Sequence, residues 1–139
     1  MPRNTLKFTP EYNFELAAIV CNSNIYQLVW AMNNLLQLDF TADDNITIWH
    51  PKLSVSQQFE VFSSISADEL IVIRLIANKS NNGFLVEELK NIDFFVHVSG
   101  EAYDDYMKLL LPKFKQSSII QGVYSIDLDS LASKQKLIF

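Results

Sequence analysis

The middle of the chain holds two apolar runs, within "LIVIRLIANKSNNGFLVEELKNIDFFVHVSG" (residues 70–100). The first run, residues 70–78, is the most hydrophobic segment of the sequence and is typical of a strand. Asn82 and Gly83 favour a backbone with positive φ, so a turn is predicted there. A connector follows, and residues 91–100 predict a neighbouring strand. Two strands of one sheet are therefore expected in this stretch.

Two amphipathic helices are predicted, one on each side of this stretch. Over residues 24–37, apolar side chains recur at helical spacing and form one stripe. Over residues 102–115 a second stripe recurs, with aspartates near its start and lysines near its end, as the helix dipole favours. Pro112 removes a backbone hydrogen bond, so a kink or an early end near Leu111 is expected. The first stripe consists of Ile25, Leu28, Val29, Met32, Leu35 and Leu36, and Trp30 lies to one side of it.

The order of these elements predicts an α+β fold. We expect a largely antiparallel sheet of about five strands, with both helices packed on one face and a ferredoxin-like or ACT-like topology. Residues 1–12 are expected to form an N-terminal arm, and residues 13–139 a single α+β domain. The remaining strands of this sheet are predicted at residues 13–21, 56–65 and 119–128, and 56–65 is expected to form an antiparallel hairpin with 70–78. Residues 38–54 are interpreted as an excursion that has room for an additional edge strand at 46–49.

The composition narrows the class of function. The net charge is −5 and the basic residues are scattered, so nucleic acid is disfavoured as a partner. No apolar run approaches the roughly 20 residues that cross a bilayer, and no signal peptide is visible, so we expect no membrane contact. Cys21 is the only cysteine, which rules out an internal disulfide and fits a cytoplasmic location.

A short motif spans the connector and the strand after it. Glu88 and Asp93 stand at the two acidic positions of a pattern in which apolar residues precede each acid. The pattern resembles the signature of the IPExxxVDY family of small bacterial proteins. Val86 and Ile92 match two apolar positions of the signature. Two positions depart from it, with Glu87 in place of proline and Phe94 in place of tyrosine.

The resemblance extends over most of the chain. Residues 26–33 look like the first helix of that family, residues 74–88 look like its strand and turn, and the tail at 137–139 also fits. The resemblance implies a bacterial protein of the Bacteroidetes group, and it implies no activity. The two departures relax the connector and remove one hydroxyl group, and they matter little for a site.

Glu88, Asp93 and Arg74 are the candidate ligand-binding residues. Catalysis by paired carboxylates needs two groups at a defined separation, which this spacing does not provide. We expect Glu88 to accept backbone N–H bonds and Asp93 to pair with a cation. Arg74 interrupts an apolar strand, so a buried Arg74 needs an anionic partner, with Asp93 first and Glu88 second. In the alternative, Arg74 clamps a carboxylate or phosphate ligand.

The histidines and the cysteine form no recognisable site. Asp93 and His97 lie about 13 Å apart along one strand, too far for a dyad. We expect His97 to face solvent or to be a satisfied core residue. Cys21 precedes a helix start, a position that can lower a thiol pKa, but a structural role is favoured. No metal site, cofactor or catalytic residue is expected.

The sequence therefore favours a non-enzymatic protein-interaction or dimerisation module. Phe94 and Phe95 alternate along one strand, so both sheet faces carry rings, and a homodimer through the sheet or its edge would bury them. The alternative is an ACT-like regulatory domain that binds a small metabolite, with Arg74 or backbone amides near Gly122 holding its carboxylate. An enzyme is the least favoured class, because the sequence shows no catalytic constellation.

Overall fold

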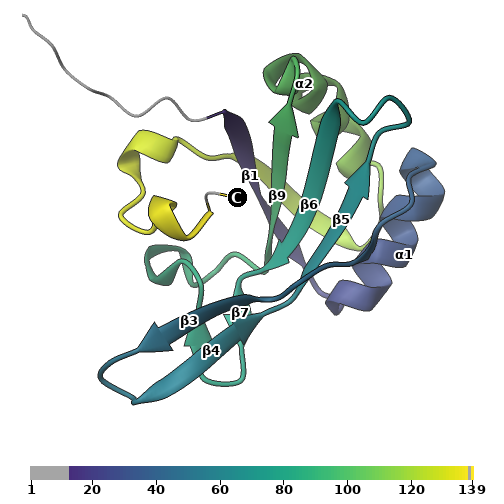
Figure 1. Cartoon of the computed structure of the whole chain (residues 1–139). Helices are drawn as coiled ribbons and strands as arrows, with labels where there is room; N and C mark the ends of the chain where they lie inside the picture. The colour runs from purple at the N-terminus through teal and green to yellow at the C-terminus, as the bar shows by residue number, and fades with distance from the viewer. Residues whose placement is uncertain (1–12, 138) are drawn as a thin grey trace, which may run out of the picture.

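A computed structural model of the chain describes residues 13–137 and residue 139 (Figure 1). The predicted arm over residues 1–12 lies outside the described residues. As predicted, the described elements form an α+β fold with an antiparallel sheet and two α-helices. Across the sheet, the strands follow the order β10 (Ile120–Ser125), β1 (Phe14–Cys21), β9 (Phe94–Gly100), β6 (Ile71–Ala77), β5 (Val61–Ile65) and β2 (Thr41–Ala42).

The sheet has one strand more than the sequence predicted. β2 has only 2 residues, which pair with β5, and so short a strand leaves no alternation to read. The predicted β5–β6 hairpin is confirmed, with Ser63 opposite Arg74. On the side of β6 away from β5, β6 pairs with β9, and Arg74 lies opposite His97. The two strands are therefore neighbours, as predicted.

Both helices pack on one face of the sheet, as predicted. α1 (Ile25–Leu36) begins with a capping box: Asn24 Oδ1 accepts the Gln27 N–H at 2.9 Å, and Gln27 Oε1 accepts the Asn24 N–H at 3.3 Å. α2 (Tyr103–Phe114) contacts β1, β9 and β10. The core on this face joins helix and strand residues, among them Leu28, Met32, Met107, Phe114, Ile19, Ile73, Leu75 and Val96.

Of the two expectations for Pro112, a kink or an early end near Leu111, the early end is wrong. The helix runs through Pro112 and ends at Phe114. Pro112 lacks an N–H and weakens the last turn, but Phe114 is fully buried in the core. Packing of this ring therefore holds the turn, since tertiary contacts supply most of the stability of a short helix.

Residues 46–59 form a hairpin outside the main sheet. β3 (Ile46–His50) pairs antiparallel with β4 (Val55–Phe59), and Figure 1 shows the hairpin at the lower left of the molecule. The strand predicted over residues 56–65 is therefore two strands, β4 and β5, in different sheets. Phe59, at the end of β4, is buried among residues of the second sheet face, which explains why the chain bends there.

The second face of the sheet is covered by two segments of the same chain. One is the connector, with β7 (Lys79–Ser80), β8 (Gly83–Phe84) and η1 (Glu87–Leu89). The other is the C-terminal segment, residues 126–137 and 139, with η2 (Leu128–Ser130) and η3 (Lys134–Leu137), drawn in yellow in Figure 1. Together they bury one cluster that includes Phe14, Leu16, Ala18, Ile76, Leu85, Val86, Phe95, Leu131 and Leu137.

This cover changes the argument for a dimer. The rings of Phe94 and Phe95 were expected to need a second copy, but their exposed fractions are 7% and 0%. Segments of the chain itself remove both rings from water. Burial of these rings therefore gives no reason for self-association through a sheet face.

Asn78 fixes the path of the connector. Its side chain is fully buried, and its Nδ2 donates to the carbonyls of Leu89 and Ile92, both at 2.9 Å. Its Oδ1 accepts the Val86 N–H at 2.8 Å. One amide side chain thus binds three backbone groups, of which the Leu89 carbonyl also accepts the Ile92 N–H at 3.1 Å.

The ferredoxin-like or ACT-like topology stays a prediction. β1 and α1, and β9 and α2, form strand–helix pairs on one face, and β1 lies between β10 and β9, as in a split βαβ arrangement. However, the chain passes from α1 to β6 through β2, the β3–β4 hairpin and β5. These additional elements extend the sheet beyond a plain ferredoxin-like core.

Candidate functional site

Glu88 holds the C-terminal segment. Its Oε2 accepts the N–H groups of Ala132 at 2.7 Å and Ser133 at 3.1 Å, and its Oε1 accepts the Ser133 hydroxyl at 2.7 Å. Burial acts to raise the pKa of Glu88, but the hydrogen bonds from Ser133 and the backbone outweigh it and lower that pKa. The expected acceptor role is confirmed, although the donors belong to the C-terminal segment and not to the connector.

Asp93 ties the end of β1 to the start of β9. Its Oδ1 lies 2.7 Å from Lys79 Nζ, and its Oδ2 accepts the Cys21 N–H at 2.9 Å. The expected cation is present, but it is Lys79, and the predicted pairing of Asp93 with Arg74 is wrong. The strand register explains why Asp93 pairs with Lys79. Ala77 lies opposite Phe94, which brings Lys79 and Asp93 close together, whereas Arg74 lies further along β6 and opposite His97.

Arg74 lies against the C-terminal segment. Its Cζ is 4.3 Å from the centroid of the Phe139 ring, a cation–π distance. Burial lowers the pKa of Arg74, and the charge of Asp43 acts in the opposite direction. Glu88, the second predicted partner, is held by Ser133 and Ala132 instead. An aromatic ring therefore contacts the guanidinium where the sequence predicted a carboxylate.

His97 is a core residue with 1% of its side chain exposed. Its Nε2 lies 3.0 Å from the Leu137 carbonyl, which can only accept, so this nitrogen carries the proton. The ring stacks on Phe14 at 4.2 Å and meets Phe139 edge-on at 4.9 Å. Burial first, and the charge of Arg74 second, lower the pKa of His97 to about 4. Nδ1 has no hydrogen-bond partner among the described residues.

The candidate residues do not gather into one site. Within residues 13–137 and 139, no hydrogen bond or ion pair joins any two of Arg74, Glu88 and Asp93.

Cys21 is buried, and burial raises the pKa of its thiol, while contacts with Ser23 act to lower that pKa. A raised pKa disfavours the thiolate, so the structural role of Cys21 is the better supported one.

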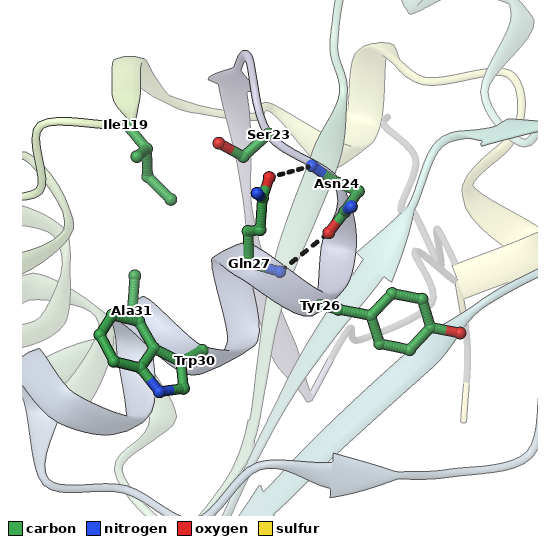
Figure 2. Close-up of a pocket in the computed structure, with 7 residues that line it drawn as sticks. All are labelled: Ser23, Asn24, Tyr26, Gln27, Trp30, Ala31 and Ile119. Atoms are coloured by element: carbon green, nitrogen blue, oxygen red, sulfur yellow. Dashed lines mark hydrogen bonds between the residues drawn. The ribbon is translucent and has the colours of Figure 1, made fainter.

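A largely apolar hollow on the surface lies beside α1. It has a volume of about 460 Å³ and lies between the N-terminal half of α1 and the turn that precedes β10. Figure 2 shows the ring of Tyr26 pointing away from Trp30. Trp30 is 71% exposed, which is unusual for so large an apolar side chain. The lining residues are Ser23, Asn24, Tyr26, Gln27, Trp30, Ala31 and Ile119.

None of the residues that line this hollow is charged. Residues 16–38, which include α1, carry no charged side chain, and neither do residues 116–126, which include β10. A second hollow runs along β10 and is lined by Ile120 to Tyr124 and by Lys115. We call the exposed residues of α1 and of residues 116–125 the neutral surface, which is bordered by Lys115 and by Glu60, the acceptor of a hydrogen bond from the Tyr26 hydroxyl at 2.8 Å. Sequence reasoning noted Trp30 but missed this surface, although the two charge-free stretches were visible.

Neither a metal-ligand cluster nor a membrane-spanning helix occurs among the described residues. No group of three histidine, cysteine or acidic side chains in residues 13–137 and 139 is arranged to hold a metal ion. None of the described helices combines the length and apolar character needed to span a bilayer. In comparisons with known proteins, no family model and no curated protein sequence matches the chain.

Proposed function

We propose that the chain is a non-enzymatic protein-interaction module that binds a protein partner through the neutral surface. The observation that carries this proposal is the 71% exposure of Trp30 beside an apolar hollow on a helix without charge. Tryptophan and tyrosine are enriched at the energetic centres of protein interfaces, where charged residues are depleted. α1 has both rings on its exposed side, with Tyr26 62% exposed.

The fold gives this surface a rigid support. The buried side of α1 anchors the helix in the core through Leu28 and Met32, both 0% exposed. The capping box fixes its first turn. A partner therefore meets an ordered helix, and little conformational entropy is lost on binding.

A small-metabolite site at Arg74 is less well supported. The guanidinium lies over the Phe139 ring, and Glu88 and Asp93 are engaged elsewhere.

We also propose membership of the IPExxxVDY family. The motif carboxylates Glu88 and Asp93 support it, since each joins segments that are distant in the sequence.

Affinity purification from native lysate tests the proposed function, with mass spectrometry of co-purifying proteins and small molecules. Trp30→Gln should lose a stoichiometric protein partner that the wild-type chain retains. Trp49→Gln is the matched control, because Trp49 is 59% exposed but lies on the β3–β4 hairpin. Recovery of one stoichiometric metabolite and no protein would contradict the proposal, as would a partner that Trp30→Gln still binds.

A further inference from the structure

The backbone of β10 has one unpaired side in the described chain. β10 is the outermost strand of the sheet, with β1 as its only neighbour among the described strands. The Ile126 N–H donates to the Leu16 carbonyl at 3.0 Å, and Ala18 lies opposite Tyr124. Because antiparallel strands alternate the direction of their backbone groups, Val123 and Ser125 direct their N–H and C=O groups away from β1.

β10 itself carries none of the usual protections against pairing with another strand, although Lys115 lines the hollow beside it. Natural edges are commonly protected by charged side chains, by proline or by bulges. Residues 116–126 contain no charged residue and no proline, and the irregular register lies only at the start of β10, beside Val20 and Cys21. Residues 122–125 therefore present a regular and unprotected edge.

The charge of the chain indicates which partner fits this edge. The chain carries a net charge of −5, so two copies repel each other over most of their surface. Because residues 116–126 carry no charge, two copies can bring their β10 strands together without placing charges of these strands opposite each other. An antiparallel edge is also complementary to itself under a two-fold rotation, as a closed dimer requires.

We propose that two copies of this chain pair antiparallel through β10, about a two-fold axis at Tyr124. Val123 of one copy then exchanges backbone hydrogen bonds with Ser125 of the other, and the reverse pair forms at the symmetric position. This inference names the partner for one part of the neutral surface, and it rests on the proposed function as an interaction module.

The position of the axis follows from the side chains. In this register Tyr124 lies opposite its own copy at a non-hydrogen-bonded pair, where opposing side chains come closest. Tyr124 is 55% exposed, and its ring lies over Gly122, where an added Cβ would clash with it. Pairing buries the two rings against each other, an arrangement that favours aromatic pairs. Asp127 then lies opposite the uncharged Gln121 of the second copy, so Asp127 meets no like charge in the paired strand.

The mass of the full-length chain in solution tests this proposal, measured by sedimentation equilibrium over a range of concentrations. The wild type should reach twice the 16.0 kDa of one chain. Tyr124→Lys and Tyr124→Glu should each remain monomeric, because like charges then face each other across the axis. An equimolar mixture of the two variants should form a heterodimer, because opposite charges then meet. Circular dichroism should show that both variants fold, since Tyr124 is exposed.

A second variant tests the backbone hydrogen bonds. Ser125→Pro removes an N–H that points away from β1, so the fold should persist while each dimer loses two hydrogen bonds. The dissociation constant should rise at least about tenfold. Leu109→Lys is the control, because Leu109 is 68% exposed but lies on α2, and it should leave the dimer unchanged.

The outcomes separate this proposal from the proposed function. A wild-type chain that is monomeric throughout overturns the β10 dimer, and so does a dimer that all the Tyr124 and Ser125 variants retain. A strand of another protein is the alternative occupant of this edge. In that case the free chain stays monomeric, and a protein captured from lysate no longer binds when Ser125 is replaced by proline. This result also overturns the dimer. In each of these cases, a Trp30-dependent partner would leave the proposed function standing.

Discussion

Glu88 and Ser133 are joined by two hydrogen bonds, one from the Ser133 hydroxyl at 2.7 Å and one from its backbone N–H at 3.1 Å. The carboxylate thereby fastens the C-terminal segment to the connector. Under this segment lies the core of the second sheet face, with Leu131 and Leu137 inserted into it. This polar contact therefore adds to the apolar packing that holds the C-terminal segment on the sheet.

Removal of the Glu88 carboxylate should loosen the C-terminal segment. Glu88→Ala leaves three donors without their acceptor, two of them backbone N–H groups, and because the site is exposed to water the cost should be about 1 kcal/mol. Urea unfolding measures this change. Glu87→Ala is the control, since Glu87 is the exposed neighbour, and it should change the free energy of unfolding by less than about 0.5 kcal/mol. Equal effects of the two substitutions would contradict the assigned role of Glu88.

His97 should make the fold sensitive to acid. Its pKa is about 4 in the folded chain, against an ordinary value of 6.5 for a histidine side chain in water. Between these values the unfolded chain binds the extra proton, so the free energy of unfolding falls as the pH drops from 6.5 to 4. The loss is about 3 kcal/mol at most. Urea midpoints measured across this range should show the slope.

Three variants test whether His97 causes this dependence of the free energy of unfolding on pH. His97→Phe should flatten it, whereas His50→Gln, in the β3–β4 hairpin, should leave it unchanged. Arg74→Met removes a neighbouring positive charge, so the pKa of His97 should rise above about 4 when NMR follows the ring signals. A slope that survives in His97→Phe would show that other groups cause it.

Substitution of Asn78 should have the largest effect on stability. Asn78→Leu leaves the buried Ile92 carbonyl and the buried Val86 N–H without this partner, while the Leu89 carbonyl still accepts the Ile92 N–H. Unsatisfied buried groups of this kind should cost about 2–4 kcal/mol in total. Thermal and urea unfolding measure it, with exposed Asn81→Ala as the control. A change below about 1 kcal/mol would mean that the connector does not depend on this amide.

The two partners of the Lys79–Asp93 ion pair should respond unequally. Lys79 is 51% exposed, so Lys79→Met should cost less than about 1 kcal/mol and less still at high salt. Asp93→Ala also removes the acceptor of the Cys21 N–H and should cost more, about 1–2 kcal/mol, with little dependence on salt. Unfolding curves at low and high salt compare the two. Equal and equally salt-dependent losses would assign the whole role of Asp93 to the ion pair.

Local patterns predicted most of the elements and fewer of their boundaries. The apolar stripe of α1 depends only on the period of the helix, so its bounds were predicted to within one residue at each end. The bend at Glu60 was missed, because residues 56–65 keep the composition of a strand on both sides of it. Pro112 was over-weighted, since the burial of Phe114 holds the last turn of α2.

The chemical type of each polar contact was easier to predict than the partner. Acceptance of N–H bonds by Glu88 and pairing of Asp93 with a cation follow from the chemistry of carboxylates. The actual partners depend on strand register and on the C-terminal segment, and Glu88 reaches Ala132 across 44 positions of the chain. Contacts over such separations leave no periodic trace in the sequence. The amino-acid order therefore determined the elements and the charge-free stretches, while long-range packing alone decided how the second face is covered and which side chains stay exposed.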